Sequence, residues 1–239
     1  EEIDLVRESS LLVAKTHAEI ARHIKPGISS LSLNSIAEEF IRDNGGIPAF
    51  KGYNGFPCTL CVSPNEQVVH GIPNNKPLLD SSILSVDCGV YMNGYYGDSC
   101  RMYPVGDISE EIAQLSEVTK ESLLASIKVI KPYESINVIG DAIEGVVNPY
   151  GYGIVEMFGG HGIGNQFHED PFVYHYSKKE KLMICVPGMV FTIEPMINLG
   201  TYDCEIGDDG WTATTKDKKV STQWEHTVLI TEEGAEILT

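Results

Sequence analysis

Two aspartates flank an Asn-Gly turn in a stretch of the chain that is otherwise apolar. With Asn93-Gly94 as a two-residue hairpin loop, Gly89 lies opposite Asp98, and Asp87 lies two residues before Gly89 on the same strand. Asp87 and Asp98 are then diagonal neighbours on one face, roughly 7–8 Å apart at the backbone. Two carboxylates in such apolar surroundings are unfavourable unless a cation lies between them. The hairpin alone also fits a solvated face of an edge ribbon.

Two glutamates later in the chain lie in similar apolar segments. Glu194 falls in an expected strand at residues 190–196, and Glu225 falls in another at residues 222–228. Glu225 faces away from His226, to which we assign a core or supporting role. Glutamate is seldom buried without a partner. If the N-terminal and C-terminal halves of the chain pack about a pseudo-two-fold axis, the two aspartates and two glutamates converge at the interface between the halves.

Three histidines are candidates to complete such a site. His161 lies in the glycine-rich segment 159–164, where a bare backbone lets a metal or substrate approach closely. The spacing of these glycines is not that of a dinucleotide-binding loop. His168 follows in the same segment of chain, and His70 ends an expected strand. One imidazole with four carboxylates is an oxygen-rich set that can hold two divalent ions about 3.5–4 Å apart. The other histidines interpreted as structural are His17, His23 and His175.

The composition limits the classes of partner. The chain has 17 lysines and arginines against 34 aspartates and glutamates, a net charge of −17. Nucleic-acid-binding proteins need a surplus of cations, so we expect no direct nucleic-acid binding and no binding to anionic membranes. No apolar run reaches the roughly 18–20 residues of a membrane span. Six cysteines in a chain of this length do not suggest a disulfide framework, so we expect a reduced, cytoplasmic protein.

Hydrophobic periodicity predicts two similar halves, about 1–105 and 106–239, that share one core in a single domain. Ile24-Lys25-Pro26 and Ile130-Lys131-Pro132 lie 106 residues apart, and each half has two helices followed by strands. The fold class is therefore α+β with an internal duplication. The expected helices lie around residues 3–24, 36–41, 109–130 and 142–147, and the further expected strands at 59–62, 68–70, 83–91 and 95–103.

Five motifs, in order and with matching spacing, resemble those of the methionine aminopeptidase family. They are His-Gly-Ile-Pro at 70–73, the Asp87–Asp98 hairpin, Gly-His-Gly-Ile-Gly at 160–164 with the later His168, Phe-Thr-Ile-Glu-Pro at 191–195, and Glu-His-Thr at 225–227. The resemblance extends over essentially the whole chain. It implies the duplicated pita-bread fold, with pseudo-two-fold symmetry and an antiparallel sheet backed by two helix pairs. Glu194 and Glu225 are 31 residues apart, which matches the short bacterial type I enzymes.

The resemblance also implies roles for the site residues. The implied metal ligands are Asp87, Asp98, His161, Glu194 and Glu225. Asp98 and Glu225 would bridge two divalent ions (Co, Mn, Fe or Zn), which activate water and polarise the scissile carbonyl. Glu194 would shuttle the water proton to the leaving amine. His70 and His168 would bind the substrate and the developing oxyanion.

The methionine side chain of the substrate is expected to enter an apolar pocket with a soft lining. The positions that match the family's pocket are Tyr53, Phe56, Cys61, Phe167 and Trp211, with Phe50 less securely aligned. Cys58 and Cys61 form a C-x-x-C pattern, which also occurs in zinc knuckles and redox pairs. No second pair follows, so we favour a pocket wall. Asn54 stands where bacterial relatives often carry histidine.

The implied function is removal of methionine from the N-termini of nascent polypeptides by a monomer that contacts the ribosome transiently. The loop 202–209 is acidic where bacterial relatives tend to be basic, which argues against docking through that loop. One alternative is a prolidase or aminopeptidase P of the same fold, which usually carries a further N-terminal domain. A second alternative is an inactive module that only binds peptides. That alternative predicts degraded ligand positions, whereas all five are intact.

Overall fold

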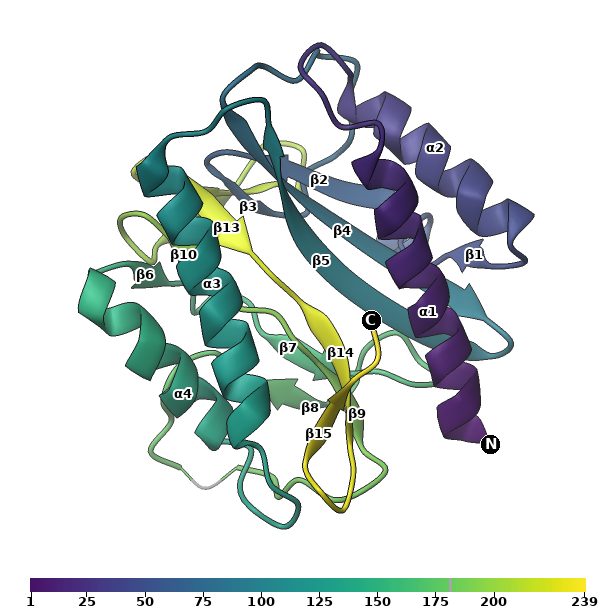
Figure 1. The fold of residues 1–239 in the computed structure, drawn as a ribbon, viewed down its shortest axis with the longest axis vertical. Coiled ribbons are helices and arrows are strands. Elements are labelled where there is room, and N and C mark those ends of the chain that lie inside the picture. The colour runs from purple at the N-terminus through teal and green to yellow at the C-terminus, as the bar shows by residue number, and fades with distance from the viewer. Residues whose placement is uncertain (181) are drawn as a thin grey trace.

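Two pairs of helices lie on one side of a set of antiparallel strands (Figure 1). The computed structural model of the chain describes residues 1–180 and 182–239. The helices are α1 (Glu2–Ala21), α2 (Ser30–Asp43), α3 (Glu110–Val129) and α4 (Val138–Val147). The first pair packs against strands of the N-terminal half and the second pair against strands of the C-terminal half. This order of elements confirms the predicted duplication.

The helix ends follow local signals in the sequence. α2 begins after Ser29 and α3 after Ser109, and each serine oxygen accepts a hydrogen bond from the backbone amide three residues on. α2 ends at Asp43, directly before Asn44-Gly45-Gly46, residue types that favour the end of a helix. α1 ends at Ala21, so Ile24 lies outside the helix that was predicted to include it.

The hairpin that carries both aspartates has the predicted register. It consists of β4 (Ser82–Met92) and β5 (Tyr95–Val105), in which Met92 pairs with Tyr95 and Gly89 pairs with Asp98. Asp87 pairs with Cys100, so the two aspartates are diagonal neighbours as expected. The same sheet contains β1 (Ile47–Pro48) and β2 (Leu60–Pro64), both paired with β4.

The described residues form three further antiparallel sheets. The largest has the order β15 (Ala235–Ile237), β14 (His226–Ile230), β9 (Val190–Ile193), β7 (Gly160–Gly162) and β8 (Glu169–Val173). The second contains β13 (Ser221–Gln223), β10 (Met196–Asn198) and β6 (Gly153–Ile154), and the third β11 (Cys204–Ile206), β12 (Ala213–Thr215) and β3 (Gln67–Val69). Short 3₁₀ turns lie at η1 (Tyr53–Gly55) and η2 (Asn148–Tyr150). The third sheet joins the halves, because β3 comes from the first half and its partners from the second.

The two segments predicted as continuous strands around a glutamate are broken at that glutamate. Within residues 190–196, β9 ends at Ile193 and β10 begins at Met196. Within residues 222–228, β13 ends at Gln223 and β14 begins at His226. Glu194 precedes Pro195, which has no amide to donate to a strand ladder. The amide of Glu225 donates to the carbonyl of Cys100 on β5 of the N-terminal half. The prediction that each segment forms one continuous strand was therefore wrong.

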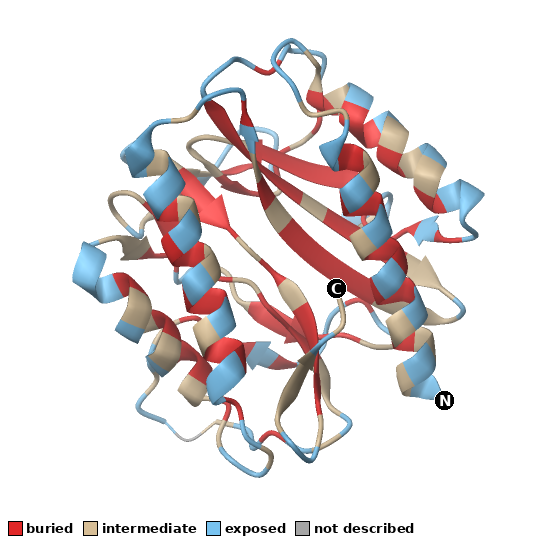
Figure 2. Ribbon diagram, in the orientation of Figure 1, coloured by how far each residue is buried: buried red, intermediate tan, exposed pale blue. Residues whose placement is uncertain are grey.

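Buried residues line the inner faces of all four helices, and exposed residues lie on their outer faces (Figure 2). Each half encloses its own apolar cluster, with Leu33 and Ile41 in the first and Leu123 and Ile143 in the second. All six cysteines are buried and carry free thiols. Within the described ranges, no helix is long and apolar enough to cross a membrane.

Candidate metal centre and substrate cleft

Five side chains that the sequence singled out come together where the two halves meet. Asp87 on β4 and Asp98 on β5 come from the N-terminal half. His161 lies on β7, Glu194 lies between β9 and β10, and Glu225 lies between β13 and β14. All five line one cleft. The fold thus brings together residues as far apart in the sequence as Asp87 and Glu225, which are separated by 138 positions.

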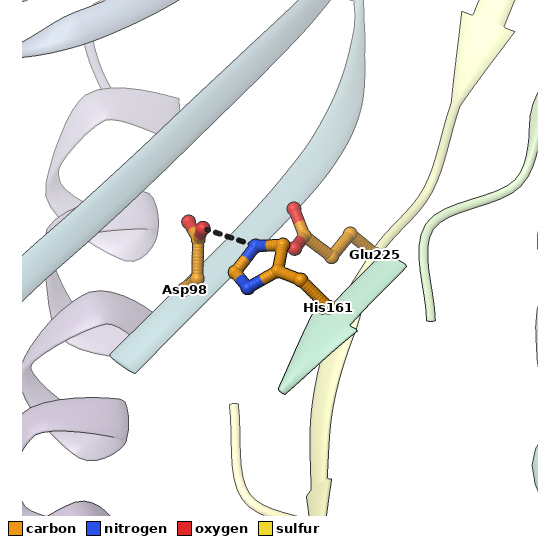
Figure 3. A group of neighbouring side chains, drawn as sticks. All are labelled: Asp98, His161 and Glu225. Carbon is orange, nitrogen blue, oxygen red and sulfur yellow. Dashed lines mark ion pairs between the residues drawn. The ribbon is translucent and has the colours of Figure 1, made fainter. Parts of the chain in front are cut away.

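The spacing of three of these side chains suits a metal ion (Figure 3). One ligand atom each from Asp98, His161 and Glu225 lies within 4.8 Å of the others. His161 Nε2 is 3.8 Å from Asp98 Oδ2 and 3.9 Å from Glu194 Oε1. These separations are too long for hydrogen bonds but match atoms that surround a cation.

The orientation of His161 leaves one ring nitrogen available as a ligand. Its Nδ1 lies 2.9 Å from the carbonyl oxygen of Gly162, an acceptor, so Nδ1 carries the hydrogen. Nε2 then presents its lone pair to the carboxylates. The backbone amide of His161 donates to Thr192 Oγ1 at 3.0 Å, which fixes the strand that carries the ring.

Three neighbours hold Glu194 in place. Thr192 Oγ1 donates to Glu194 Oε1 at 2.8 Å, and Gln223 Nε2 donates to Oε2 at 3.3 Å. The amide of Glu194 donates to Nε2 of the buried His175 at 3.1 Å. Burial lowers the pKa of His175 to about 3, so the ring stays neutral and can accept this hydrogen bond.

A seam of hydrogen bonds sets Glu225 against the strand of Asp98. Thr227 Oγ1 accepts from the amide of Asp98 at 3.2 Å and donates to its carbonyl oxygen at 2.8 Å. Ser99 Oγ donates to the carbonyl of Glu225 at 2.9 Å, and the amide of Glu225 donates to the carbonyl of Cys100 at 2.9 Å. The distance between the two ligand-bearing strands is therefore fixed by side chains as well as by the backbone.

The charges at this centre are uncompensated within the described part of the chain. Burial, followed by repulsion from neighbouring carboxylates, raises the pKa of Glu194 to about 8 and the pKa values of Asp98 and Glu225 well above their usual range. Burial likewise raises the pKa of Asp87 to about 7. His161 lies 3.8 Å from Asp98 and 3.9 Å from Glu194, but burial lowers its pKa, so its neutral ring does not compensate these charges.

Two buried oxygens at the centre lack partners. Oδ1 of Asp87 and Oδ1 of Asp98 are inaccessible and accept no hydrogen bond from the described residues. Buried polar atoms are normally satisfied, and four adjacent carboxylates cannot all ionise without positive charge nearby. The donor set of carboxylate oxygens and one imidazole nitrogen therefore fits divalent cations.

The cleft above this centre has a volume of about 320 Å³. It brings together every residue proposed for the substrate side: Phe50, Tyr53, Phe56, Cys61, His70, Phe167, His168 and Trp211. Phe50, Phe56 and Phe167 belong to one buried apolar cluster, against which Trp211 packs. Trp211 also meets Phe56 edge-on, with ring centroids 5.1 Å apart. The cleft is thus apolar on one side and anionic on the other.

His70, from the N-terminal half, and His168, from the C-terminal half, both line the cleft. His168 Nδ1 lies 2.9 Å from Tyr53 Oη, and its ring centroid lies 4.0 Å from that of His161. Burial, with a smaller contribution from His161, lowers the pKa of His168 to about 3. His70 has φ of 59° and packs edge-on against Phe158, and burial lowers its pKa as well. Both rings are neutral at neutral pH.

The remaining histidines have structural environments. His17 is fully buried, with Nε2 2.9 Å from the carbonyl of Ser99 and Nδ1 3.1 Å from Tyr103 Oη. His226 Nδ1 binds Thr239 Oγ1 at 3.0 Å, away from the carboxylates. His23 lies on the surface, 3.1 Å from Glu19.

Several supporting residues had no signal in the sequence. Thr192, Thr227 and Ser99 read as ordinary strand residues, because alternation along a strand does not reveal which hydroxyl meets a backbone group of another strand. His175 was classed as structural, which its burial supports, but its contact with Glu194 was not foreseen. The cleft also includes Met157, Phe158, Phe172 and Met196, none of which belongs to the motifs.

Comparison with known proteins agrees with the geometry of this site. The chain matches the model of metallopeptidase family M24 over residues 4–232. It is 47% identical over 238 residues to methionine aminopeptidase 1 of Bacillus subtilis, covering 100% of this chain and 96% of that protein. It is 43% identical to methionine aminopeptidase 2 of Mycobacterium tuberculosis, covering 100% of this chain and 84% of that protein.

Solved structures show the same fold. The crystal structure of methionine aminopeptidase from Rickettsia prowazekii superposes with a TM-score of 0.96 at 41% identity, over 98% of this chain and 95% of that chain. The prolidase from Pyrococcus furiosus has a TM-score of 0.82 at 24% identity and is matched over 63% of its length, a likeness that concerns the fold. The predicted pita-bread fold is confirmed. The chain belongs to metallopeptidase family M24 and, within it, to the methionine aminopeptidases.

Proposed function

We propose that this chain is a dimetal aminopeptidase that removes the N-terminal methionine from peptides and nascent proteins. The observation that carries this proposal is the meeting of four carboxylates and one imidazole at one side of a cleft of about 320 Å³ whose other side is apolar. An anionic centre attracts cations, and an apolar cavity of this size accepts one thioether side chain. Family membership supports the same reaction class.

Asp87, Asp98, His161, Glu194 and Glu225 would hold two divalent ions. When bound, the ions supply Lewis acidity toward the scissile carbonyl and lower the pKa of water. Mn, Fe, Co and Zn are all compatible with oxygen-rich ligation that includes one imidazole. The unpartnered oxygens of Asp87 and Asp98 support this assignment, since cations would satisfy them.

The protein groups handle the proton and the substrate. Glu194 accepts a proton from the attacking water and returns it to the leaving amine. His168 and His70 bind the peptide and the oxygen on which negative charge develops. If the hydroxyl of Tyr53 donates to His168 Nδ1, then His168 Nε2 carries the hydrogen and can donate it to a substrate carbonyl.

The apolar wall would select methionine. Tyr53, Phe56, Phe167 and Trp211 present ring faces and edges, and thioether sulfur packs favourably against aromatic rings. Cys61 lies in the same cluster, buried and with a free thiol. Its pKa is raised well above the usual value by burial, so it acts as a soft wall and not as a nucleophile.

We further propose that residues 1–239 work as one catalytic domain, with halves at about 1–105 and 106–239, because neither half holds the full ligand set. We assign the enzyme to the cytoplasm as a monomer that meets nascent chains through transient ribosome contact. In the acidic loop, Lys218 Nζ lies 2.6 Å from Glu205, and Lys216 lies 3.9 Å from Asp203. Local lysines are therefore neutralised, which argues against direct binding to ribosomal RNA through this loop.

Release of free methionine from Met-Gly-Met-Met tests the proposal after the chelated protein is loaded separately with Mn, Fe, Co or Zn. We expect activity with at least one metal and none with chelator. A parallel Ala-Pro substrate separates this activity from Xaa-Pro cleavage. Absence of methionine release with every metal, in protein shown to be folded, would contradict the proposed function.

A further inference from the structure

A row of three aromatic rings begins at the rim of the cleft. Phe172 lies on β8, and Tyr174 and Tyr176 follow at alternate positions beyond its last residue, Val173. The ring centroids of Phe172 and Tyr174 are 4.7 Å apart, and those of Tyr174 and Tyr176 are 5.5 Å apart. We call this row the aromatic ladder.

The ladder is continuous with the metal centre. Phe172 pairs with His161 across β8 and β7, and directly opposed residues of a sheet point to the same face. Phe172 lines the cleft and is 45% exposed. A Cβ atom at Gly159 would collide with the Phe172 ring, so glycine at this position makes room for the ring at the rim.

The outer end of the ladder is fixed by a cation. Lys178 Nζ lies 4.7 Å from the ring centroid of Tyr174 and 5.5 Å from that of Tyr176, a cation–π arrangement. β8 is also the outermost strand of its sheet, so one of its edges pairs with no strand of the described chain. An edge strand can receive an extended peptide through backbone hydrogen bonds.

We propose that the aromatic ladder binds the stretch of substrate polypeptide that follows the N-terminal methionine. This inference rests on the proposed function, since it is the entry of methionine into the cleft that directs the following residues past Phe172. The ladder has the length of roughly three residues of extended chain, at about 3.3–3.6 Å each. Rings contact many kinds of side chain, which suits an enzyme that meets varied sequences.

The charge of the chain favours an apolar contact of this kind. At a net charge of −17, long-range attraction cannot hold neutral or acidic substrates. Stacking and edge contacts with aromatic rings do not depend on the charge of the substrate. The ladder therefore increases the affinity for longer substrates, an increase that the electrostatic field of the protein does not provide.

The test compares the tripeptide Met-Ala-Ser with the hexapeptide Met-Ala-Ser-Val-Phe-Ser on the metal-loaded enzyme. We expect KM to be about three- to tenfold lower for the hexapeptide, the effect of one or two aromatic contacts. Tyr174→Ser should abolish this difference and leave the kinetics of the tripeptide unchanged. Tyr174→Phe should retain the difference. Tyr174→Gln, which keeps a long side chain, replaces the serine variant if that variant does not fold.

Tyr150→Ser is the matched control, because Tyr150 also belongs to a stacked tyrosine pair, with Tyr152 at 5.6 Å, and does not line the cleft. It should behave as the parent enzyme with both peptides. An equal preference for the hexapeptide in the parent and in Tyr174→Ser would overturn the inference. A change in the sedimentation coefficient of Tyr174→Ser without a change in KM for the hexapeptide would also overturn it, because the ladder would then be an interface between two copies of the chain. Failure to cleave even the tripeptide would instead contradict the proposed function.

Discussion

The hydroxyl of Thr227 binds the backbone of Asp98 twice, accepting from its amide at 3.2 Å and donating to its carbonyl at 2.8 Å. The two residues belong to different halves of the duplicated fold. Because Thr227 lies two residues after Glu225, this contact sets the spacing of Asp98 and Glu225, two of the proposed metal ligands.

Removal of this hydroxyl should weaken the metal site. Thr227→Val keeps the shape of the side chain but leaves two buried backbone groups of Asp98 unpaired, at a cost of about 1–3 kcal/mol in unfolding free energy. We expect metal affinity to fall about tenfold, the usual scale for residues that orient ligands. Calorimetric titration with Mn²⁺ and urea denaturation measure the two effects. Thr227→Ser keeps a hydroxyl and should restore most of the metal affinity. Equal metal affinity in Thr227→Val and in the parent protein would contradict this prediction.

Asp98→Asn should separate stability from activity. In chelated protein at pH 8 we expect the unfolding free energy to rise, on the order of 1–2 kcal/mol, because one of four repelling carboxylates becomes neutral. Metal affinity and peptide cleavage should fall at least a hundredfold. Urea denaturation with EDTA, beside a peptide assay with excess Mn²⁺, gives both values. A destabilised chelated variant would mean that Asp98 is held by groups other than its carboxylate neighbours.

The metal-free protein should lose stability as pH rises. Folding raises the pKa of Asp87 to about 7 and that of Glu194 to about 8, above the unfolded values of 3.8 and 4.5. The folded state therefore binds more protons in this window, and its stabilisation is complete below about pH 4 and is lost as pH rises through 7–8. Each proton contributes about 1.4 kcal/mol per pH unit. Urea midpoints from pH 5 to 8 in EDTA should decline, and saturating Mn²⁺ should remove the decline.

His17 should produce the opposite trend at lower pH. Burial lowers its pKa to about 3 in the folded state from 6.5 when unfolded. Its contribution is complete above pH 6.5 and is lost as pH falls toward 3, because the unfolded chain takes up the proton first. His17→Gln should be less stable than the parent at pH 7, with a gap that narrows by about 2 kcal/mol at pH 5. A gap independent of pH would show that His17 is not held neutral.

The local geometry around Asp87 and Asp98 could be predicted from the sequence. The Asn93-Gly94 dipeptide specifies a two-residue turn, and strand pairing then follows by counting, so the pairing of Gly89 with Asp98 needed no tertiary information. The internal repeat likewise predicted that Glu194 would face the hairpin of Asp87.

The tertiary contacts of the two glutamates could not be predicted in this way. At the two strand breaks, the amide of Glu194 donates to His175 of the same half, and the amide of Glu225 donates to the carbonyl of Cys100 in the other half. Periodicity reports which face of a strand is buried but not which distant group meets it. The five motifs therefore indicated the proposed ligands, while the residues that orient these side chains became visible only in three dimensions.

The Asp98–Thr227 contact also has a consequence for the order in which the enzyme is made. Ribosomes release the chain from its N-terminus, so the hairpin of Asp98 emerges long before Thr227, which lies 129 residues later in the sequence. Until then its amide and carbonyl have water as their partner, and both glutamates are absent or unplaced. The proposed metal centre can therefore form only after both halves of the fold have left the ribosome.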